Sequence, residues 1–306
     1  MNISYEVFDS KSPKITGQAS IVLVSLDSTV RSYWHQAVAS LRSDITLNRY
    51  VIDEVHLILT EASYRDVMHH IKELRNHSVQ MVLLSATIAP TSIASIREQA
   101  NLAQGLETLI IRASSNRPEL YFQPPQAYSD FTTALPSIIK FIQNKLKAFT
   151  KRPLCRALVF VQRIDHGHRV AGALSCDFYR GSTDKELNDQ EREAMVNRWL
   201  NGQHNIMVAT DAFGPGNDYP HVQQVFFVAS PRGIVDFLQM AGRAGRNGQV
   251  ASIYTFLLAD TTPFFSHTAI AAHLGASELA PLLKKPLFRC WRSVFCQFLD
   301  GVAQPC

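Results

Sequence analysis

The chain has 306 residues, and at a typical domain size of about 150 residues this length predicts two domains. Hydrophobic residues make up 46% of it and charged residues 18%, which excludes a disordered, self-repelling chain. The net charge of +4 is small, so charge alone neither requires nor excludes a polyanionic partner.

The N-terminus and the cysteines indicate an intracellular protein. No cationic stretch leads into an apolar one after Met1, so we expect no secretory signal. No apolar run approaches the roughly 18 residues of a membrane span, and we expect no membrane partner. Five cysteines at irregular spacing do not form the pattern of a disulfide framework.

Short apolar runs of strand length recur along the chain. Because they do not alternate polar with apolar residues, they are typical of strands buried on both faces of a parallel sheet. Between them, Leu135 to Phe149 has helical spacing, and Thr183 with Glu186 predicts a capping box before a helix that reaches about Leu200. This alternation predicts an α/β fold. The predicted strands are Ile21 to Val24, Tyr50 to Ile52, Met81 to Leu84, Leu158 to Val161, Ile206 to Ala209, Val225 to Val228 and Ile253 to Leu258.

The pattern stops between residues 112 and 126, where prolines block helix and central strand. This predicts a domain boundary. We expect a first domain over residues 1–113, a linker and entry segment over 114–130, a second domain over 131–260 and a short cysteine-containing tail over 261–306.

Three of the predicted strands are followed by small polar or acidic residues. Asp53 and Glu54 follow the strand ending at Ile52, Ser85 and Thr87 follow Leu84, and Thr210 follows Ala209. In open α/β sheets, ligands bind beyond the carboxyl ends of strands. An Asp-Glu pair there suits a phosphate enzyme, in which one acid holds Mg²⁺ through water and its neighbour orients the attacking water. On its own, such a pair is more often a turn or a helix cap.

Two arginines lie three positions apart much further along, in the run from Gln239 to Arg246. Arg243 and Arg246 would share one face of a helix, and guanidinium groups suit phosphate oxygens. Each alone is more often a solvated helix residue. Their occurrence downstream of the Asp-Glu pair favours a nucleotide site.

Several ordered motifs carry a resemblance to a known family. Val51 to His56, Ser85 to Thr87 and Gln239 to Arg246 resemble motifs II, III and VI of the superfamily-two helicases, in that order. Phe213 to Pro220 is similar to motif V of the RecQ branch. The resemblance covers roughly residues 2 to 306 and is strongest toward fungal RecQ-like helicases.

Two shorter segments add to this resemblance. Tyr64 and Arg65 stand where the family has an aromatic-arginine pair in a loop that couples DNA to ATP. Tyr179 to Gly181 resembles the family's motif after the second strand of the second lobe. The resemblance implies two RecA-like lobes with parallel sheets, ATP held between them and DNA lying across both.

The resemblance also implies roles for individual residues. Asp53 would hold the water shell of Mg²⁺, Glu54 would orient the hydrolytic water, and Arg246 would be the arginine finger. Further residues at the nucleotide would be His56, Asp218 near the ribose, Gln239 and Arg243. Ser85 and Thr87 would couple nucleotide state to lobe closure. The residues that would contact or sense DNA are Tyr64, Arg65, Arg180 and Thr210.

One element of the family is missing from the sequence. The family holds the β and γ phosphates with a Gly-Lys-Ser/Thr loop, and none of the 14 glycines here is followed by Lys. By resemblance the chain begins partway through the first lobe, so we expect that lobe to be incomplete and covered by a protein partner. We therefore expect very weak or no ATPase activity from this polypeptide alone. A reading frame upstream that encodes the loop would restore the enzyme.

The tail resembles a clipped form of the family's zinc region. A structural zinc site normally closes with four ligands, including a close Cys-x-x-Cys pair, and no such pair occurs. Cys290 and Cys306 would be the first two ligands of an incomplete site. Elsewhere, Trp199, Cys155 and Cys176 are expected in the core.

The sequence as a whole favours a truncated RecQ-like helicase whose family reaction is ATP-dependent 3'-to-5' unwinding of DNA. The expected partner is single-stranded DNA or a duplex junction, and the family implies a nuclear location. A first alternative is a non-catalytic nucleic-acid-binding module. A second is a decayed fragment of a mobile-element helicase.

Overall fold

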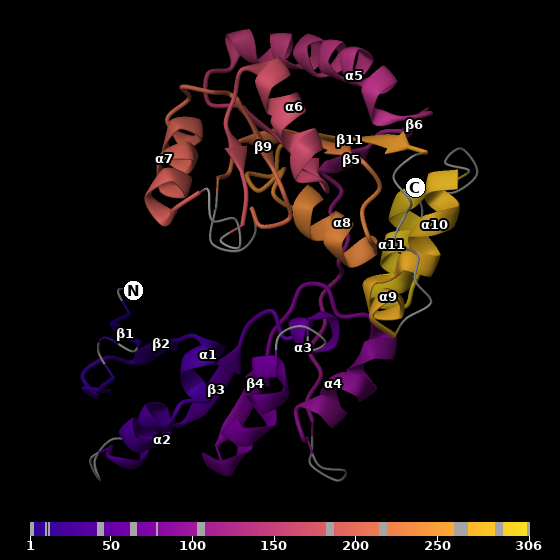
Figure 1. Cartoon of the computed structure of the whole chain (residues 1–306). Helices are drawn as coiled ribbons and strands as arrows, with labels where there is room; N and C mark the ends of the chain where they lie inside the picture. Colours follow the sequence, from indigo (N-terminus) through magenta and orange to yellow (C-terminus); the bar gives the residue numbers. More distant parts are fainter. Residues whose placement is uncertain are drawn as a thin grey trace. The chain divides into compact units, whose positions relative to one another are not determined.

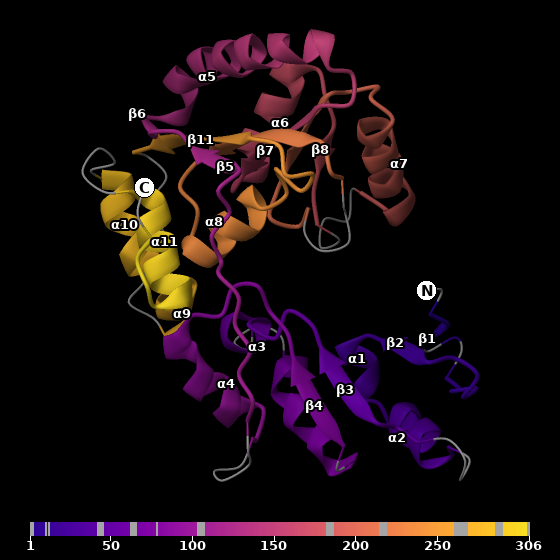
Figure 2. The same cartoon turned by 180° about the vertical axis from the view of Figure 1, so that it is seen from behind.

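The computed structural model separates the chain into two compact units, Met1–Ala113 and Ser114–Cys306 (Figures 1 and 2). Each unit is described by itself. The structure describes residues 3–9, 11, 13–41, 46–61, 66–77, 79–102, 108–181, 187–213, 219–259, 269–284 and 290–304.

Short parallel strand pairs and small helices build the first unit. Strand β1 pairs with β2, and β3 pairs with β4, both in parallel. The strands are β1 (Tyr5–Phe8), β2 (Ile21–Val24), β3 (Arg49–Ile52) and β4 (Gln80–Leu83). The helices are α1 (Leu26–Thr29), α2 (Ser32–Ala39), α3 (Leu57–Thr60), η1 (Asp66–His77), η2 (Pro90–Ser92) and α4 (Ile93–Gln99).

Two apolar clusters hold these elements together. Phe8 meets Trp34 edge to face at 4.9 Å between ring centroids, and Tyr50 lies beside Trp34. A second cluster beside β3 and β4 gathers residues of α3, η1 and α4, including Ile58 and Ile71. The turn after β3 and the loop after β4 are therefore packed onto a core of their own.

A seven-stranded parallel sheet forms the centre of the second unit. Its order is β5-β11-β10-β7-β9-β8, and β6 also pairs with β11. The strands are β5 (Leu120–Phe122), β6 (Gln126–Tyr128), β7 (Arg156–Val161), β8 (Phe178–Tyr179), β9 (Ile206–Ala209), β10 (Val222–Val228) and β11 (Ala251–Leu258). The helices are α5 (Phe131–Leu146), η3 (Lys147–Lys151), α6 (Ile164–Leu174), α7 (Asp189–Leu200), α8 (Ile234–Ala241), α9 (Ala269–Leu274), α10 (Ala276–Lys284) and α11 (Trp291–Asp300).

Helices cover both faces of this sheet, as Figures 1 and 2 show. Alternate residues of β7 enter different cores: Leu158 packs with α7, α8, α10 and α11, whereas Val159 packs with α5 and α6. Every residue of β7, β9 and β10 is buried. Burial on both faces explains why these strands are unbroken apolar runs in the sequence.

The structure confirms the predicted α/β class and the seven predicted strands: two have the predicted bounds, and the other five differ by one to three residues at their ends. The helix predicted from Leu135 is α5, which begins after the N-cap Asp130. The predicted capping box at Thr183 and Glu186 lies outside the described residues. Within them, α7 starts after Asn188, whose side chain forms a capping box with Glu191, and it ends at Leu200 as predicted.

In the described part of the chain, no helix is both long enough and apolar enough to cross a membrane.

Candidate functional site

The turn after β3 carries the predicted acidic pair. Asp53 is exposed and Glu54 is half-buried, and the carboxylate of Asp53 accepts a hydrogen bond of 2.9 Å from the backbone N–H of Glu54. Glu54 has a φ of 50°, a left-handed conformation that costs a non-glycine residue roughly 1–2 kcal/mol. Residues held in such conformations cluster at functional sites, and this one directs the carboxylate of Glu54 toward His56.

A partly buried polar network links this turn to the loop after β4. The Nδ1 atom of His56 lies 2.9 Å from Ser85 Oγ and 3.3 Å from Glu54 Oε2. Ser85 Oγ also accepts the N–H of Thr87 at 3.1 Å. The backbone N–H of Val55 donates to the carbonyl of Leu84, so backbone and side chains both join the two loops. The structure thus brings together four predicted residues, Glu54, His56, Ser85 and Thr87.

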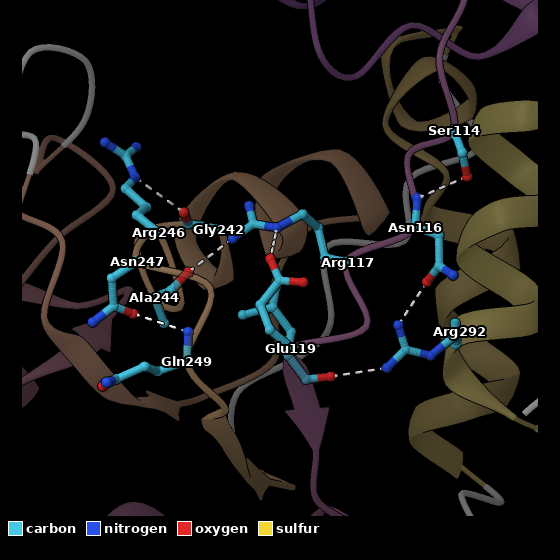
Figure 3. A network of polar contacts seen from close by, with 11 residues as sticks. Ser114, Asn116, Arg117, Glu119, Gly242, Ala244, Arg246, Asn247, Gln249 and Arg292 are labelled. Carbon is cyan, nitrogen blue, oxygen red and sulfur yellow. Dashed lines mark hydrogen bonds and ion pairs between the residues drawn. The ribbon is translucent and has the colours of Figure 1, made fainter.

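The second unit carries the predicted arginines in the loop after α8. We call residues Gly242–Gln249 the arginine loop. Arg243 is half-buried, and Arg246 is exposed with its Nε donating to the carbonyl of Gly242 at 3.3 Å. Gln239 lies one turn earlier, within α8. Figure 3 shows the guanidinium of Arg246 directed away from the other labelled side chains.

Arg180 and Thr210 follow neighbouring strands of the same sheet. The N–H of Thr210, just after β9, donates to the carbonyl of Tyr179 at 3.1 Å. Arg180, just after β8, is buried; its guanidinium lies 5.5 Å from the ring centroid of Phe178 and hydrogen-bonds to His168. The structure therefore brings these two predicted residues to the same edge of the sheet.

Several predicted site residues lie outside the described residues: Tyr64, Arg65, Asp218 and Cys306. Cys290 is described and immediately precedes α11. Among the described residues, no group of three or more His, Cys, Asp or Glu side chains could hold a metal ion. Of the residues expected in the core, Trp199 and Cys155 are buried, whereas Cys176 is half-buried.

Comparisons with known proteins match this arrangement to helicases. Residues 138–248 match the helicase conserved C-terminal domain. The chain is 29% identical over 214 residues to the ATP-dependent DNA helicase Q-like 4B of Arabidopsis thaliana, covering 69% of this chain and 18% of that protein. It is 25% identical over 223 residues to the ATP-dependent DNA helicase RecQ of a Synechocystis species, covering 70% of this chain and 44% of that protein. The chain is thus similar in sequence to the RecQ-like superfamily-two helicases, and it carries a helicase conserved C-terminal domain.

A solved structure agrees with the fold. The RecQ-like chain resembles the Mycobacterium smegmatis helicase Lhr, solved with single-stranded DNA and AMP-PNP, with a TM-score of 0.62 and 17% identity over 92% of this chain and 37% of that one. This likeness supports the RecA-like fold. The RecQ-like chain spans less than half the length of the two curated relatives compared above.

The acidic turn fits a magnesium ion bound mainly through water. Mg²⁺ usually keeps several waters and uses one or two protein carboxylates together with substrate phosphates. The exposed carboxylate of Asp53 offers such a ligand, and the half-buried Glu54 beside it lies within 3.3 Å of a histidine nitrogen. These residues therefore fit a Mg²⁺ ion bound to a nucleotide, and they do not by themselves supply a complete set of protein ligands.

Sequence reasoning missed the residues that hold the arginine loop in place. Arg117 and Glu119, taken as part of the linker, contact that loop, and Arg292 of α11 contacts the same segment. The opposite charges two positions apart, just before β5, were a signal of an ion pair. Nothing in the sequence pattern indicated that the pair would face a loop more than 120 residues later.

Proposed function

We propose that the chain carries the nucleotide-responsive and nucleic-acid-binding parts of an ATP-dependent 3'-to-5' DNA helicase. The observation that carries this proposal is the contact of the buried His56 with Ser85, beside Glu54. Through this contact, the turn that carries Glu54, a residue suited to orient water, is joined to the loop that follows the neighbouring strand β4. A change at the triphosphate would therefore move two loops together.

On the nucleotide side, Asp53 would ligate the water shell of Mg²⁺ and Glu54 would orient the attacking water. The bound magnesium-triphosphate supplies the phosphoanhydride bond whose cleavage drives movement on DNA. Arg246 would neutralise charge on the phosphate oxygens, with Arg243 and Gln239 in support. In related phosphoryl-transfer enzymes, such an arginine is worth about 10³ to 10⁵ in rate.

On the nucleic-acid side, Arg180 and Thr210 would contact the phosphate backbone. Both lie at the carboxyl ends of strands β8 and β9, where parallel sheets bind ligands. Contacts to phosphates recognise charge and not base sequence, so binding is expected to weaken steeply as the salt concentration rises.

ATP turnover by this polypeptide alone is expected to be weak or absent. No glycine in the 306 residues is followed by lysine, so the phosphate cradle of the family is not among them. The same observation favours a second candidate function, a module that binds single-stranded DNA without hydrolysing ATP.

An ATPase assay with single-stranded DNA, comparing the full chain with Glu54→Gln, separates the two candidates. Turnover that falls in Glu54→Gln would establish hydrolysis, and equal background from both proteins would leave the binding module. The second assay titrates a labelled single-stranded DNA at several salt concentrations. Arg180→Ala is expected to weaken binding at low salt, and salt-independent or absent binding would contradict both candidates.

A further inference from the structure

The segment that opens the second unit is anchored to α11. We call residues Ser114–Leu120 the bracket. Arg292 of α11 donates from Nη1 to Asn116 Oδ1 at 2.6 Å and from Nη2 to the carbonyl of Leu120 at 3.1 Å (Figure 3). One guanidinium therefore fixes the middle and the end of the bracket to one helix.

The bracket also holds the arginine loop. Arg117 donates from Nη2 to the carbonyl of Ala244 at 3.1 Å, and its Nε donates to Glu119 (Figure 3). Gly245 has a φ of +69°, and a Cβ at that position would lie 2.9 Å from Glu119 Cγ. The loop thus turns sharply with its backbone directly against the Arg117–Glu119 pair.

The electrostatics of the pair differ from those of an exposed ion pair. The side chain of Glu119 is 17% exposed and that of Arg117 is 38% exposed. Burial by itself would raise the pKa of Glu119, but the hydrogen bond from Arg117 and the charges of Arg117 and Arg292 lower that pKa below its ordinary value. Glu119 is therefore held as a carboxylate that orients the Arg117 guanidinium toward the loop.

We propose that Arg117 is a positioning residue for the arginine loop. It binds the carbonyl of Ala244, between Arg243 and Arg246, while Glu119 fixes the guanidinium that does so. Figure 3 shows the side chain of Arg246 directed away from Arg117, and Arg117 contacts the loop through the backbone carbonyl of Ala244. This proposal rests on the proposed function in one respect: the ligand of Arg243 and Arg246 is taken to be a phosphate.

Hydrogen exchange of the full chain tests the ordering of the loop without any nucleotide. The amides of Gly245 and Gly248 both donate within this region, to Val222 and Gly245 respectively. In Arg117→Ala their exchange is expected to rise about fivefold, the equivalent of one hydrogen bond of about 1 kcal/mol. Arg117→Lys, which keeps a donor but not the fork, is expected to exchange at an intermediate rate.

Arg198→Ala is the matched control for this measurement. Arg198 pairs with Asp177 in the same unit at nearly the same exposures, 37% and 16%, and its two hydrogen bonds go to that carboxylate. Its loss is expected to leave the exchange of the arginine loop unchanged. Unchanged loop exchange in Arg117→Ala, or an equal rise in Arg198→Ala, would overturn the proposal.

A double-mutant cycle then tests whether the ordering reaches the ligand. Binding of a fluorescent ATP analogue with Mg²⁺ is compared for the full chain, Arg117→Ala, Arg246→Ala and the double variant. Arg117→Ala is expected to weaken binding severalfold in the parent chain and to add nothing once Arg246 is gone. Fully additive losses would overturn a positioning role. No binding by the parent chain would contradict the nucleotide part of the proposed function, while hydrogen exchange still decides the role of Arg117.

Discussion

The Nδ1 atom of His56 lies 2.9 Å from the hydroxyl oxygen of Ser85, across the two loops that follow β3 and β4. His56 is only 5% exposed, and the same hydroxyl accepts the N–H of Thr87, itself 7% exposed. A single oxygen thus serves polar atoms of two buried residues. Removing it affects both the stability of the first unit and the coupling of the two loops.

Ser85→Ala is expected to destabilise the first unit by about 1–3 kcal/mol, because buried polar atoms lose a partner. Urea unfolding, with hydrogen exchange of β3 and β4 as the local readout, measures this cost. Ser40→Ala is the control, since that hydroxyl donates to Gln36 at the exposed end of α2. An equal loss in the free energy of unfolding for the two variants would show that the His56 contact stabilises the first unit no more than an exposed hydrogen bond does.

The stability of the first unit is expected to fall on acidification through His77. Its ring stacks on that of His35, with centroids 5.7 Å apart and planes 3° apart. Burial, together with the charge of His35, lowers the pKa of His77 below 6.5. The folded state therefore binds fewer protons than the unfolded state, so this contribution is complete above about pH 6.5 and is lost as the pH falls below it.

Urea midpoints between about pH 5 and 8 measure this dependence. His77→Gln is expected to flatten the acidic limb of the curve. His70→Gln, in the same helix η1, is the control, because His70 faces Glu73 at 2.7 Å and not a second histidine. A curve for His77→Gln as steep as that of the parent chain would contradict the prediction.

The buried strands could be predicted because burial on both faces leaves an unbroken apolar run. The strand β2 has such a run although Ile21 and Leu23 are exposed, whereas two other strands have none. In β1, Tyr5 and Val7 are exposed while Phe8 is buried, and β8 has only two residues. The start of α7 was harder to predict, because Asn188 with Glu191 can form the same kind of capping box as the predicted Thr183 with Glu186.

The candidate site was predictable where it depends on position along a strand. Glu54, Ser85 and Thr210 follow strands whose ends could be read from the sequence, and topology brings such ends to one edge. The supports of the arginine loop were not predictable, because Arg117 and Arg292 act on residues 127 and 172 positions away. No local pattern specifies contacts over that separation.

The end of α11 is expected to depend on Asp300. Its carboxylate accepts the backbone N–H of Ser115 at 2.9 and 3.1 Å. A negative charge in the last turn opposes the helix dipole, so Asp300 contributes through this contact and not through the helix itself. Asp300→Ala is expected to speed exchange of the Ser115 amide about fivefold and to lower the stability of the second unit by about 1 kcal/mol.

Asp300→Asn is expected to recover part of this loss, because the amide oxygen still accepts a hydrogen bond. Gln297→Ala is the control on the same helix, since Gln297 donates only to the nearby carbonyl of Gly301 among its described hydrogen bonds. Slower exchange at Ser115 in Asp300→Ala would show that the helix dipole outweighs the contact.

Arg156 at the start of β7 is expected to be the most sensitive charged residue of the second-unit core. It is 2% exposed, and it donates to the carbonyls of Trp199 at 2.6 Å and Leu200 at 3.0 Å. These carbonyls belong to the last turn of α7, where a cation is favoured by the helix dipole. A third donation, to Pro153 at 2.7 Å, ties the loop before β7 to the same guanidinium.

Arg156→Met keeps the bulk of the side chain but leaves these carbonyls without their charged donor, so a loss of about 3 kcal/mol or more is expected. Arg156→Lys is expected to recover only part of it, because an ammonium cannot reproduce the planar fork. Urea unfolding followed by tryptophan fluorescence measures both, since Trp199 lies at the contact. Arg152→Met is the control, because the side chain of Arg152 has one described hydrogen bond, to Gln223 at 3.2 Å. If Arg156→Met cost no more than Arg152→Met, the guanidinium would not be what joins α7 to the sheet.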